Sequence, residues 1–336
     1  MNIVLSARTR FWKLHTNDLM LKTAQELSSE QAGGHGDRWG VLTGGADALF
    51  DNLGVVIQES EWFDTGVVDK AAIQAVVADG QPSCFPLLYT GKEKGTSRTG
   101  AMSLHVPNQA NKEIQLWSAY PFFGDGVEIE GVVDQILVHP NHIEATLEIG
   151  LESGVLIKAF DPLFCQARAL YATGERYRFS LSALAMRPPG HIEKVIDDPD
   201  EIRQHHARRA WAEKHGQWTK EDEEAALAAW EPQSPEDLEP IRWNIGGGTM
   251  LFPSSNGFSD DALYLGEVVQ VTTNAANILG TSFWRVDVIV VRSEEIESLT
   301  IPIYVSENLF DGEWRPSIGE QVTGNAWMQA YVKARR

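Results

Sequence analysis

Basic and aromatic side chains interleave in one stretch of the sequence, at Arg203, Arg208, Arg209 and Trp211. Faces that bind nucleic acids use this combination, because guanidinium groups neutralise phosphates and aromatic rings stack on bases. Acidic residues surround these four side chains and leave the stretch net acidic. A solvated pair of salt-bridged helices is therefore favoured, and docking of a nucleic acid or a protein is the alternative.

A second stretch, Phe63-Asp64-Thr65-Gly66, matches the hydrophobic-Asp-Thr-Gly signature of aspartic proteases. That chemistry uses two carboxylates that share one proton, so a two-lobed enzyme needs a second copy of the signature. The sequence contains none, and Phe310-Asp311-Gly312 is one residue short. A homodimeric enzyme needs a compact β domain around the motif, but a helix is predicted from Asp69 to Ala78. We therefore expect a plain turn at Asp64.

The loop from Gly91 to Gly100 carries three basic side chains, Lys92, Lys94 and Arg98. It contains the residue types of a phosphate-binding loop, but a P-loop requires Gly-Lys followed by Ser or Thr at the start of a helix. Here the order differs and no helix is predicted to follow. The composition predicts an exposed loop, and contact of its basic side chains with a partner is the alternative.

The histidines do not form a strong metal-binding pattern. His205 and His206 are adjacent on a predicted helix, so they cannot face one ion together, and His215 is too far along the chain. His139 and His142 share a predicted hairpin turn, where their spacing alone permits chelation. The sequence also lacks the serine-elbow, zincin and dinucleotide-binding motifs. We therefore expect no metal and no cofactor, and we assign no catalytic residue.

A further set of aromatic and basic side chains occurs in the last third of the chain. Its candidate binding residues are Trp284, Arg285, Tyr304, Trp314, Arg315 and Trp327. OB-like barrels bind single-stranded nucleic acids by stacking aromatic rings on bases in a positive groove. Such a groove would also use Tyr331, Arg292 and Lys333. Core and barrel-end packing is the other interpretation of these rings.

The second half of the chain contains two passages with the same landmarks in the same order. The first has Gly131-Val132-Val133, Leu163-Phe164 and Gly174-Glu175, and the second has Gly266-Glu267-Val268, Leu309-Phe310 and Gly319-Glu320. Apolar residues alternate with polar ones between these landmarks, which is typical of strands with one buried face. The pattern predicts two related small antiparallel modules, either OB-like β-barrels or sandwiches.

The predicted class is α+β, with four parts. A mixed α+β domain spans 1–120 and a first β-barrel-like module spans 121–190. A helical hairpin and acidic linker span 191–242, and a second β-barrel-like module spans 243–336. The hairpin is predicted from Asp198-Pro199 as a helix start, Lys214-His215-Gly216 as its stop and a capping box at Thr219. A short helix is expected over Ala46 to Leu53, followed by a strand over Gly54 to Gln58.

The net charge limits the classes of partner, and the cysteines and the lack of long apolar runs bear on the location of the protein. The formal net charge is −19, and a field of that sign disfavours nucleic acid as a partner and allows a basic protein. The two cysteines, Cys84 and Cys165, are expected to be buried free thiols, because they lie far apart without CxxC spacing. No signal peptide or membrane span is expected, so a cytoplasmic location is the default.

Taken together, the residues favour a non-catalytic binding or assembly protein whose tandem β modules engage a macromolecular partner. Either a protein partner or self-association fits this hypothesis, and a membrane does not. A single-stranded nucleic-acid-binding protein with OB-like faces is one alternative. A hydrolase with its site in the N-terminal region, around Asp64 or the loop from Gly91 to Gly100, is the other.

Overall fold

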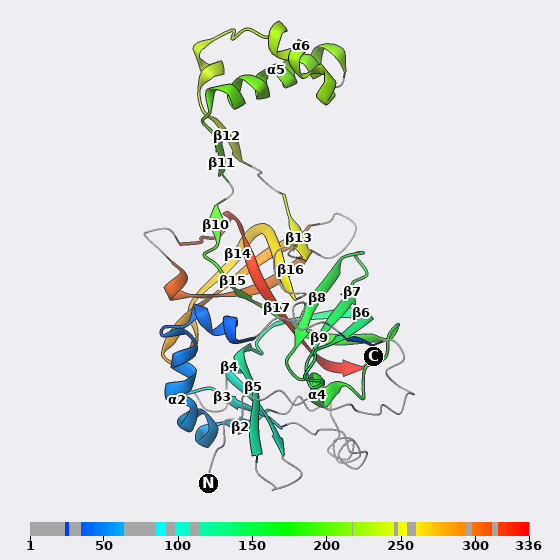
Figure 1. Ribbon diagram of the computed structural model, residues 1–336, viewed down its shortest axis with the longest axis vertical. Helices are drawn as coiled ribbons and strands as arrows, with labels where there is room; N and C mark the ends of the chain where they lie inside the picture. The colour runs from blue at the N-terminus through cyan, green and yellow to red at the C-terminus, as the bar shows by residue number, and fades with distance from the viewer. Residues whose placement is uncertain are drawn as a thin grey trace. The chain divides into compact units, whose positions relative to one another are not determined.

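The computed structural model of the protein describes residues 24–26, 35–63, 85–91, 98–107, 114–191, 193–216, 218–244, 248–253, 260–292, 298–310 and 315–335. The chain forms two compact units. Unit 1 combines Met1–Gly190 with Thr249–Arg336, and unit 2 comprises His191–Gly248. Most of the regular structure is strand with few helices, so the predicted α+β class is confirmed (Figure 1).

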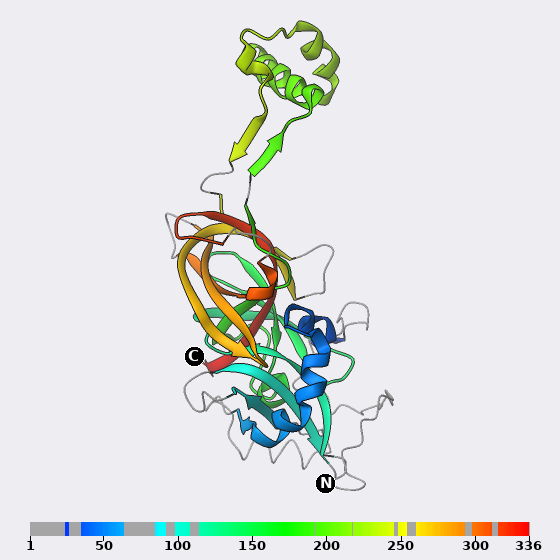
Figure 2. The ribbon, with the colours of Figure 1, turned by 90° about the vertical axis from the view of Figure 1, so that its left-hand side faces the viewer.

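Unit 1 contains a closed β-barrel of eight strands, which curve around its wall (Figures 1 and 2). In chain order the strands are β6 (Val127–Val138), β7 (Ala145–Gly150), β8 (Leu156–Asp161), β9 (Arg176–Ala185), β14 (Asp261–Ile278), β15 (Thr281–Val291), β16 (Leu299–Ser306) and β17 (Gln321–Arg335). Four further short elements accompany them: α4 (Phe164–Ala167), η4 (Glu307–Leu309), β10 (Gly190–His191) and β1 (Ala24–Glu26), the last parallel to β6. A β-barrel was predicted from the alternation of apolar residues, and the structure confirms it.

The strand pairing contains two five-strand circuits that share one pair of strands. One circuit runs β6-β7-β8-β17-β9 and returns to β6, and the other runs β14-β15-β16-β9-β17 and returns to β14. The antiparallel β9–β17 pair belongs to both. The contacts β8–β17 and β16–β9 are parallel, and the other pairs of the two circuits are antiparallel. The circuit that contains β6, β7 and β8 is thus closed through β17, and the circuit that contains β14, β15 and β16 is closed through β9.

The landmarks of the two sequence passages occupy equivalent places in these circuits. In each passage a strand valine exchanges two backbone hydrogen bonds of 2.8–3.1 Å with a Gly-Glu turn: Val133 with Gly174 and Glu175, and Val268 with Gly319 and Glu320. Both turn glycines have a positive φ, +83° and +87°, which favours glycine over other residues.

Two further glycines sit where neighbouring strands approach closely. A Cβ added at Gly131 would lie 2.4 Å from Cγ2 of Ile149, and one added at Gly266 would lie 2.0 Å from the carbonyl oxygen of Ile289. Both distances are below van der Waals contact, so these positions have no room for a side chain.

The N-terminal part of unit 1 forms a separate four-stranded antiparallel sheet in the order β2-β3-β4-β5. Its elements are η1 (His35–Val41), α2 (Gly45–Glu59), β2 (Glu61–Trp62), β3 (Phe85–Tyr89), β4 (Thr99–Pro107) and β5 (Ile114–Phe123). The strand expected over Gly54 to Gln58 is wrong, because α2 continues to Glu59. Leu49 and Val56, seven residues apart, form its buried stripe, and this packing outweighs the β preference of valine.

The four-stranded sheet packs against the barrel through aromatic rings of β5. Tyr120 meets Phe160 edge-on at 5.0 Å between ring centroids, and Phe123 stacks on Tyr304 at 4.4 Å. Gln329 of β17 joins the same contact, since its side-chain oxygen accepts from the Phe123 amide at 3.1 Å. These rings belong to a second buried core beside the one inside the barrel.

Unit 2 consists of a two-stranded antiparallel ribbon and two helices. Its elements are β11 (Glu193–Ile196), α5 (Pro199–His215), η2 (Lys220–Asp222), α6 (Glu223–Ala229), η3 (Pro235–Leu238) and β12 (Ile241–Asn244). The predicted start of α5 is confirmed, because the Asp198 carboxylate accepts from the amides of Asp200 and Glu201. The predicted stop is confirmed too, with Gly216 in the left-handed conformation.

Cys165, in α4, is disulfide-bonded. The expectation of a free thiol there is therefore wrong. Sequence separation misled the prediction, because residues far apart along a chain can meet once it folds. Cys84 lies outside the described residues.

Candidate functional site

Besides Val269 of β14, three large apolar side chains are exposed on β8, on β14 and on the short strand that pairs with β14. Leu156 of β8 is 40% exposed, Phe252 of β13 (Met250–Pro253) is 53% exposed and Leu263 of β14 is 41% exposed. Phe252 and Leu263 face each other directly in the antiparallel β13–β14 pair, so their side chains lie on the same, outer face. We refer to these three residues as the apolar patch.

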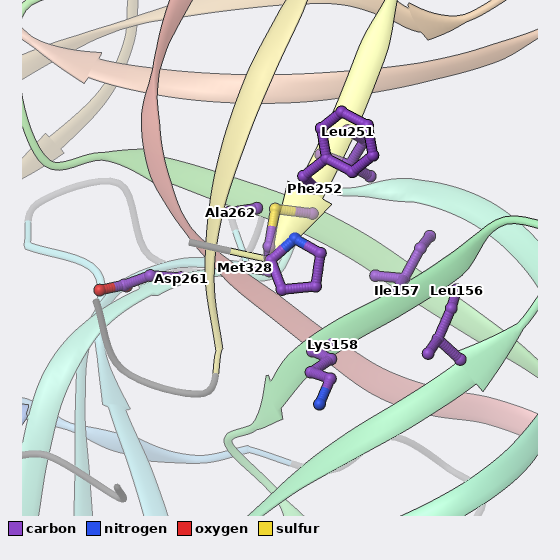
Figure 3. A pocket seen from close by; sticks show the side chains of 9 residues that line it. Leu156, Ile157, Lys158, Leu251, Phe252, Asp261, Ala262 and Met328 are labelled. Carbon is purple, nitrogen blue, oxygen red and sulfur yellow. The ribbon is translucent and has the colours of Figure 1, made fainter. Parts of the chain in front are cut away.

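A narrow pocket of about 10 Å³, with room for about one water molecule, lies beside the apolar patch (Figure 3). It is lined by Leu156, Ile157, Lys158, Leu251, Phe252, Pro253, Asp261, Ala262 and Met328. Three consecutive residues of β8 and three of β13 contribute. Consecutive side chains of a strand point to opposite faces, so a pocket that touches three in a row runs along the strand edge. We call this pocket the slot.

Two residues that line the slot, Asp261 and Met328, belong to a buried polar network. The indole Nε1 of Trp327 donates to Oδ2 of Asp260 at 2.8 Å, and the amide of Met328 donates to the Asp260 carbonyl at 2.9 Å. The guanidinium of Arg38 lies 2.8 Å from Asp261 and 5.0 Å from the centroid of the Trp327 ring. These contacts fix β14 against β17 beneath the slot.

The charged side chains that line the slot have ionic partners. Lys158 forms an ion pair with Glu148, which lies directly opposite it on β7. Asp261 pairs with the buried Arg38. The slot therefore presents an apolar rim without an uncompensated charge, which suits apolar side chains of a ligand.

Two of the aromatic candidates from the last third of the chain are buried. Trp327 is fully buried and Tyr304 is 2% exposed, because the N-terminal sheet covers them. Burial, followed by the nearby Asp125 charge, raises the pKa of Tyr304 to about 12 against the lowering effect of Arg285. Neither ring is open to stack on a ligand in this structure.

Two half-buried members of this set, Trp284 and Arg315, contact the same ring, since the Trp284 and Phe310 ring centroids lie 5.1 Å apart and Arg315 lies over Phe310 at 4.7 Å. The indole of Trp284 donates to Glu307 at 3.0 Å, and Arg285 pairs with Asp287 at 2.7 Å. Trp314 lies outside the described residues.

The three remaining residues of the expected nucleic-acid groove already have intramolecular partners. Arg292 pairs with Glu267 at 2.7 Å and Lys333 with Glu128. The Tyr331 hydroxyl is buried and donates to the carbonyl of Gly124. Arg285, Arg292 and Lys333 are thus each compensated by a carboxylate.

The candidates in unit 2 pair mostly with their own neighbours. Arg208 pairs with Glu223 at 2.9 Å and lies over the Trp218 ring at 4.6 Å. Arg209 pairs with Glu213 at 3.0 Å, four residues along α5, and the Trp211 ring contacts that of His215 at 4.2 Å. The exposed Arg203 lines a shallow groove with Asp200, Gln204, Leu227 and Ala228.

The N-terminal candidates fall mostly outside the described residues, which exclude Asp64, Lys92 and Lys94. Arg98 is exposed, and its backbone amide donates to the Asp125 carboxylate at 3.1 Å.

Asp161, at the end of β8, is a fully buried carboxylate. It accepts from the amide of Leu163 at 2.8 Å and from the hydroxyl of Tyr171 at 2.6 Å. Burial raises its pKa from 3.8 to about 7, against the lowering effect of these two hydrogen bonds. Ser306, the last residue of β16, makes the equivalent contact, because its hydroxyl accepts from the amide two residues ahead, that of Asn308.

Among the described residues, no group of three histidines, cysteines or carboxylates is placed to hold a metal ion. None of the described helices is both long enough and apolar enough to cross a membrane. In comparisons of the chain with protein-family models, curated proteins and solved structures, no match was found.

Sequence reasoning missed the apolar patch. Met250-Leu251-Phe252-Pro253 is too short to show an alternation, and it follows a glycine-rich stretch. Leu156 was assigned correctly to a hairpin strand, but the face on which it is exposed depends on how that strand meets β13. The sequence did contain one signal for the apolar patch. It was a short apolar run that ends in proline and lies next to a predicted barrel strand.

Proposed function

We propose that the protein is a non-catalytic binding or assembly protein whose barrel engages a protein partner through the apolar patch. One observation carries the proposal: Leu156, Phe252 and Leu263 are each at least 40% exposed, Leu156 and Phe252 both line the slot, and Leu263 lies directly opposite Phe252 in the β13–β14 pair. Single exposed apolar residues are ordinary on a protein surface, whereas a gathered group is typical of an interaction site.

The chemistry around the patch supports a protein partner over the other ligand classes. The slot, at about 10 Å³, is far smaller than the several hundred Å³ typical of a small-molecule site. A nucleic acid needs cations gathered on one face, but Arg285, Arg292 and Lys333 each pair with a carboxylate. The net charge of −19 adds repulsion of phosphates.

We further propose that the barrel consists of two OB-like modules derived from one repeated unit. An OB-like barrel is a small barrel of five strands, and the two five-strand circuits support this assignment. The matched hydrogen bonds of Val133 and Val268 support a common origin. Each module includes a strand that also belongs to the other module. The two modules would therefore form one rigid binding surface rather than two independent binding domains.

The test compares partner capture by matched variants. Phe252→Asp and Leu263→Asp each place a carboxylate in the apolar patch. Phe50→Asp on α2 and Ile318→Asp before β17 are controls, at residues that are 58% and 69% exposed. Wild type and the four variants, checked for an unchanged melting temperature, are immobilised and incubated with lysate of the source cells, and bound material is quantified by mass spectrometry.

We expect wild type and both controls to retain a stoichiometric protein that the patch variants retain at least tenfold less, as for the loss of an interface hot spot. Equal retention by the patch variants would contradict the proposal. So would a retained partner that nuclease treatment removes.

A further inference from the structure

We infer that Arg168 is the centre of a binding site for an oxyanion, meaning the phosphate or carboxylate group of a small ligand. Arg168 directly follows α4, the short helix after β8 (Figure 1), and Gln166 of α4 supplies a second donor. Neither residue belongs to the apolar patch or lines the slot. The inference therefore goes beyond the proposed function and does not depend on it.

Arg168 is a partly buried cation whose charge is not compensated. Its Nη2 atom is shielded from solvent and has no hydrogen-bond partner, and no carboxylate of the described residues forms an ion pair with its guanidinium. Burial lowers the pKa of this guanidinium from its ordinary value. A buried charge is costly unless an opposite charge and hydrogen bonds compensate it, so the position requires an acceptor.

Two other shielded arginines of unit 1 do have a carboxylate partner. The side chain of Arg38 is 4% exposed and lies 2.8 Å from Asp261, and that of Arg285 is 30% exposed and lies 2.7 Å from Asp287. The fold thus supplies the opposite charge at both positions. At Arg168 the part of the chain that the structure describes supplies none, which indicates that the opposite charge comes from a bound anion.

The end of α4 does not compensate the guanidinium either. The partial negative charge at a helix C-terminus sums over aligned peptide units, and α4 has only four residues. The carbonyl of Phe164 accepts from the backbone amide of Arg168 at 2.8 Å, and the carbonyls of Leu163 and Ala167 also accept from backbone amides. These three acceptors are therefore already used by the backbone of the turn.

Gln166 adds a second donor without an acceptor, two residues before Arg168. It is 7% exposed, and its Nε2 atom is shielded from solvent without a hydrogen-bond partner. A shielded amide donor that lacks an acceptor destabilises the fold, as an uncompensated charge does. Phosphate and carboxylate oxygens accept several hydrogen bonds at once, and a guanidinium binds either group with two parallel donors. An oxyanion is therefore the class of ligand that matches both side chains.

The test titrates the full chain with inorganic phosphate and, separately, with acetate. The ionic strength is held at about 0.1 M, which screens the net charge of −19 beyond roughly 10 Å. Binding is followed by isothermal titration calorimetry and by the melting temperature. The variants are Arg168→Leu and Gln166→Leu, and the matched control is Arg176→Leu, at an arginine that pairs with Glu152.

We expect at least one of the two anions to bind wild type and Arg176→Leu and to raise their melting temperatures. Binding of that anion should weaken at least tenfold in Arg168→Leu and about two- to tenfold in Gln166→Leu, as for the loss of one hydrogen bond. Without either anion, Arg168→Leu should melt no lower than wild type, because the change removes an uncompensated charge.

Tighter binding of phosphate than of acetate would assign a phosphorylated ligand to the site, and the reverse would assign a carboxylic acid. Failure of both anions to bind wild type would overturn the inference. Equal binding to wild type and Arg168→Leu would show an adventitious ion only and would overturn it too. A lower melting temperature of Arg168→Leu in the anion-free buffer would show that the guanidinium has a structural partner within the chain, which also overturns the inference.

Discussion

Replacement of Asp161 by asparagine should change how the stability of the protein depends on pH. The folded protein holds the proton of this carboxyl up to about pH 7, because burial raises its pKa from the ordinary value of 3.8 to about 7. Between these two values the folded state binds a proton that the unfolded state has released. The free energy of unfolding therefore falls as pH rises through that window.

The magnitude follows from the two pKa values. One pKa unit corresponds to about 1.4 kcal/mol, so the window from 3.8 to about 7 corresponds to about 4 kcal/mol. That is a large share of the 5–15 kcal/mol typical of a whole domain. Asparagine keeps an oxygen for the Leu163 amide and can donate to the Tyr171 hydroxyl, but it does not ionise.

The assay is urea unfolding of wild type and Asp161→Asn at pH values from 4.5 to 8. We expect the free energy of unfolding of the variant to be below or near that of wild type at acidic pH. Toward pH 8 the free energy of unfolding of the variant should rise relative to that of wild type by several kcal/mol. Asp134→Asn, the same change at an exposed position, serves as the matched control. A difference between wild type and Asp161→Asn that stays constant within about 1 kcal/mol across this range would refute the reasoning.

Four further predictions follow from the structure. Gly266→Ala should destabilise unit 1 by ~3 kcal/mol or more in chemical unfolding, because its Cβ would meet a carbonyl oxygen at 2.0 Å. Gly54→Ala in α2, with no atom within 4 Å of its Cβ, should stabilise by about 1 kcal/mol, and equal effects of the two changes would contradict the packing. Asp198→Ala removes the cap of α5 and should cost about 1 kcal/mol, seen as faster hydrogen exchange at the start of that helix; unchanged exchange would speak against the cap. Alkylation of the native, unreduced protein should leave Cys165 unmodified, and its labelling without reductant would rule out the disulfide.

Features set by neighbouring residues could be predicted from the sequence. The start of α5 depends on Asp198 and Pro199, and its end on Gly216, all within one turn of the helix they bound. Strands such as β7 and β16 show a regular alternation, because one face of each is buried in the barrel.

Features set by distant partners could not be predicted. The pairing of β9 with β17 joins residues about 150 positions apart, for example Ala183 and Met328, and no local pattern encodes it. The same holds for the burial of Trp327 and Tyr304, since it depends on the N-terminal sheet packing over the barrel. A residue type that suits stacking on a ligand suits packing in a core equally well, so only the fold separates the two uses.

The candidate site could not be predicted for a related reason. Phe252 belongs to a strand of four residues, too short to show a period, and its exposure depends on the absence of a described strand beyond β13. Leu156 and Leu263 lie in predicted strands or next to them, but on faces that only the three-dimensional pairing distinguishes.

The most direct test of the account is site-specific photo-cross-linking at Phe252. A photoreactive phenylalanine analogue is placed at position 252 in one protein and at position 50, which is 58% exposed on α2, in another. Each protein is irradiated in lysate of its source cells, and adducts are identified by mass spectrometry. We predict one dominant adduct to a single protein from position 252 and not from position 50. The same adducts from both positions, or an adduct to nucleic acid, would contradict it.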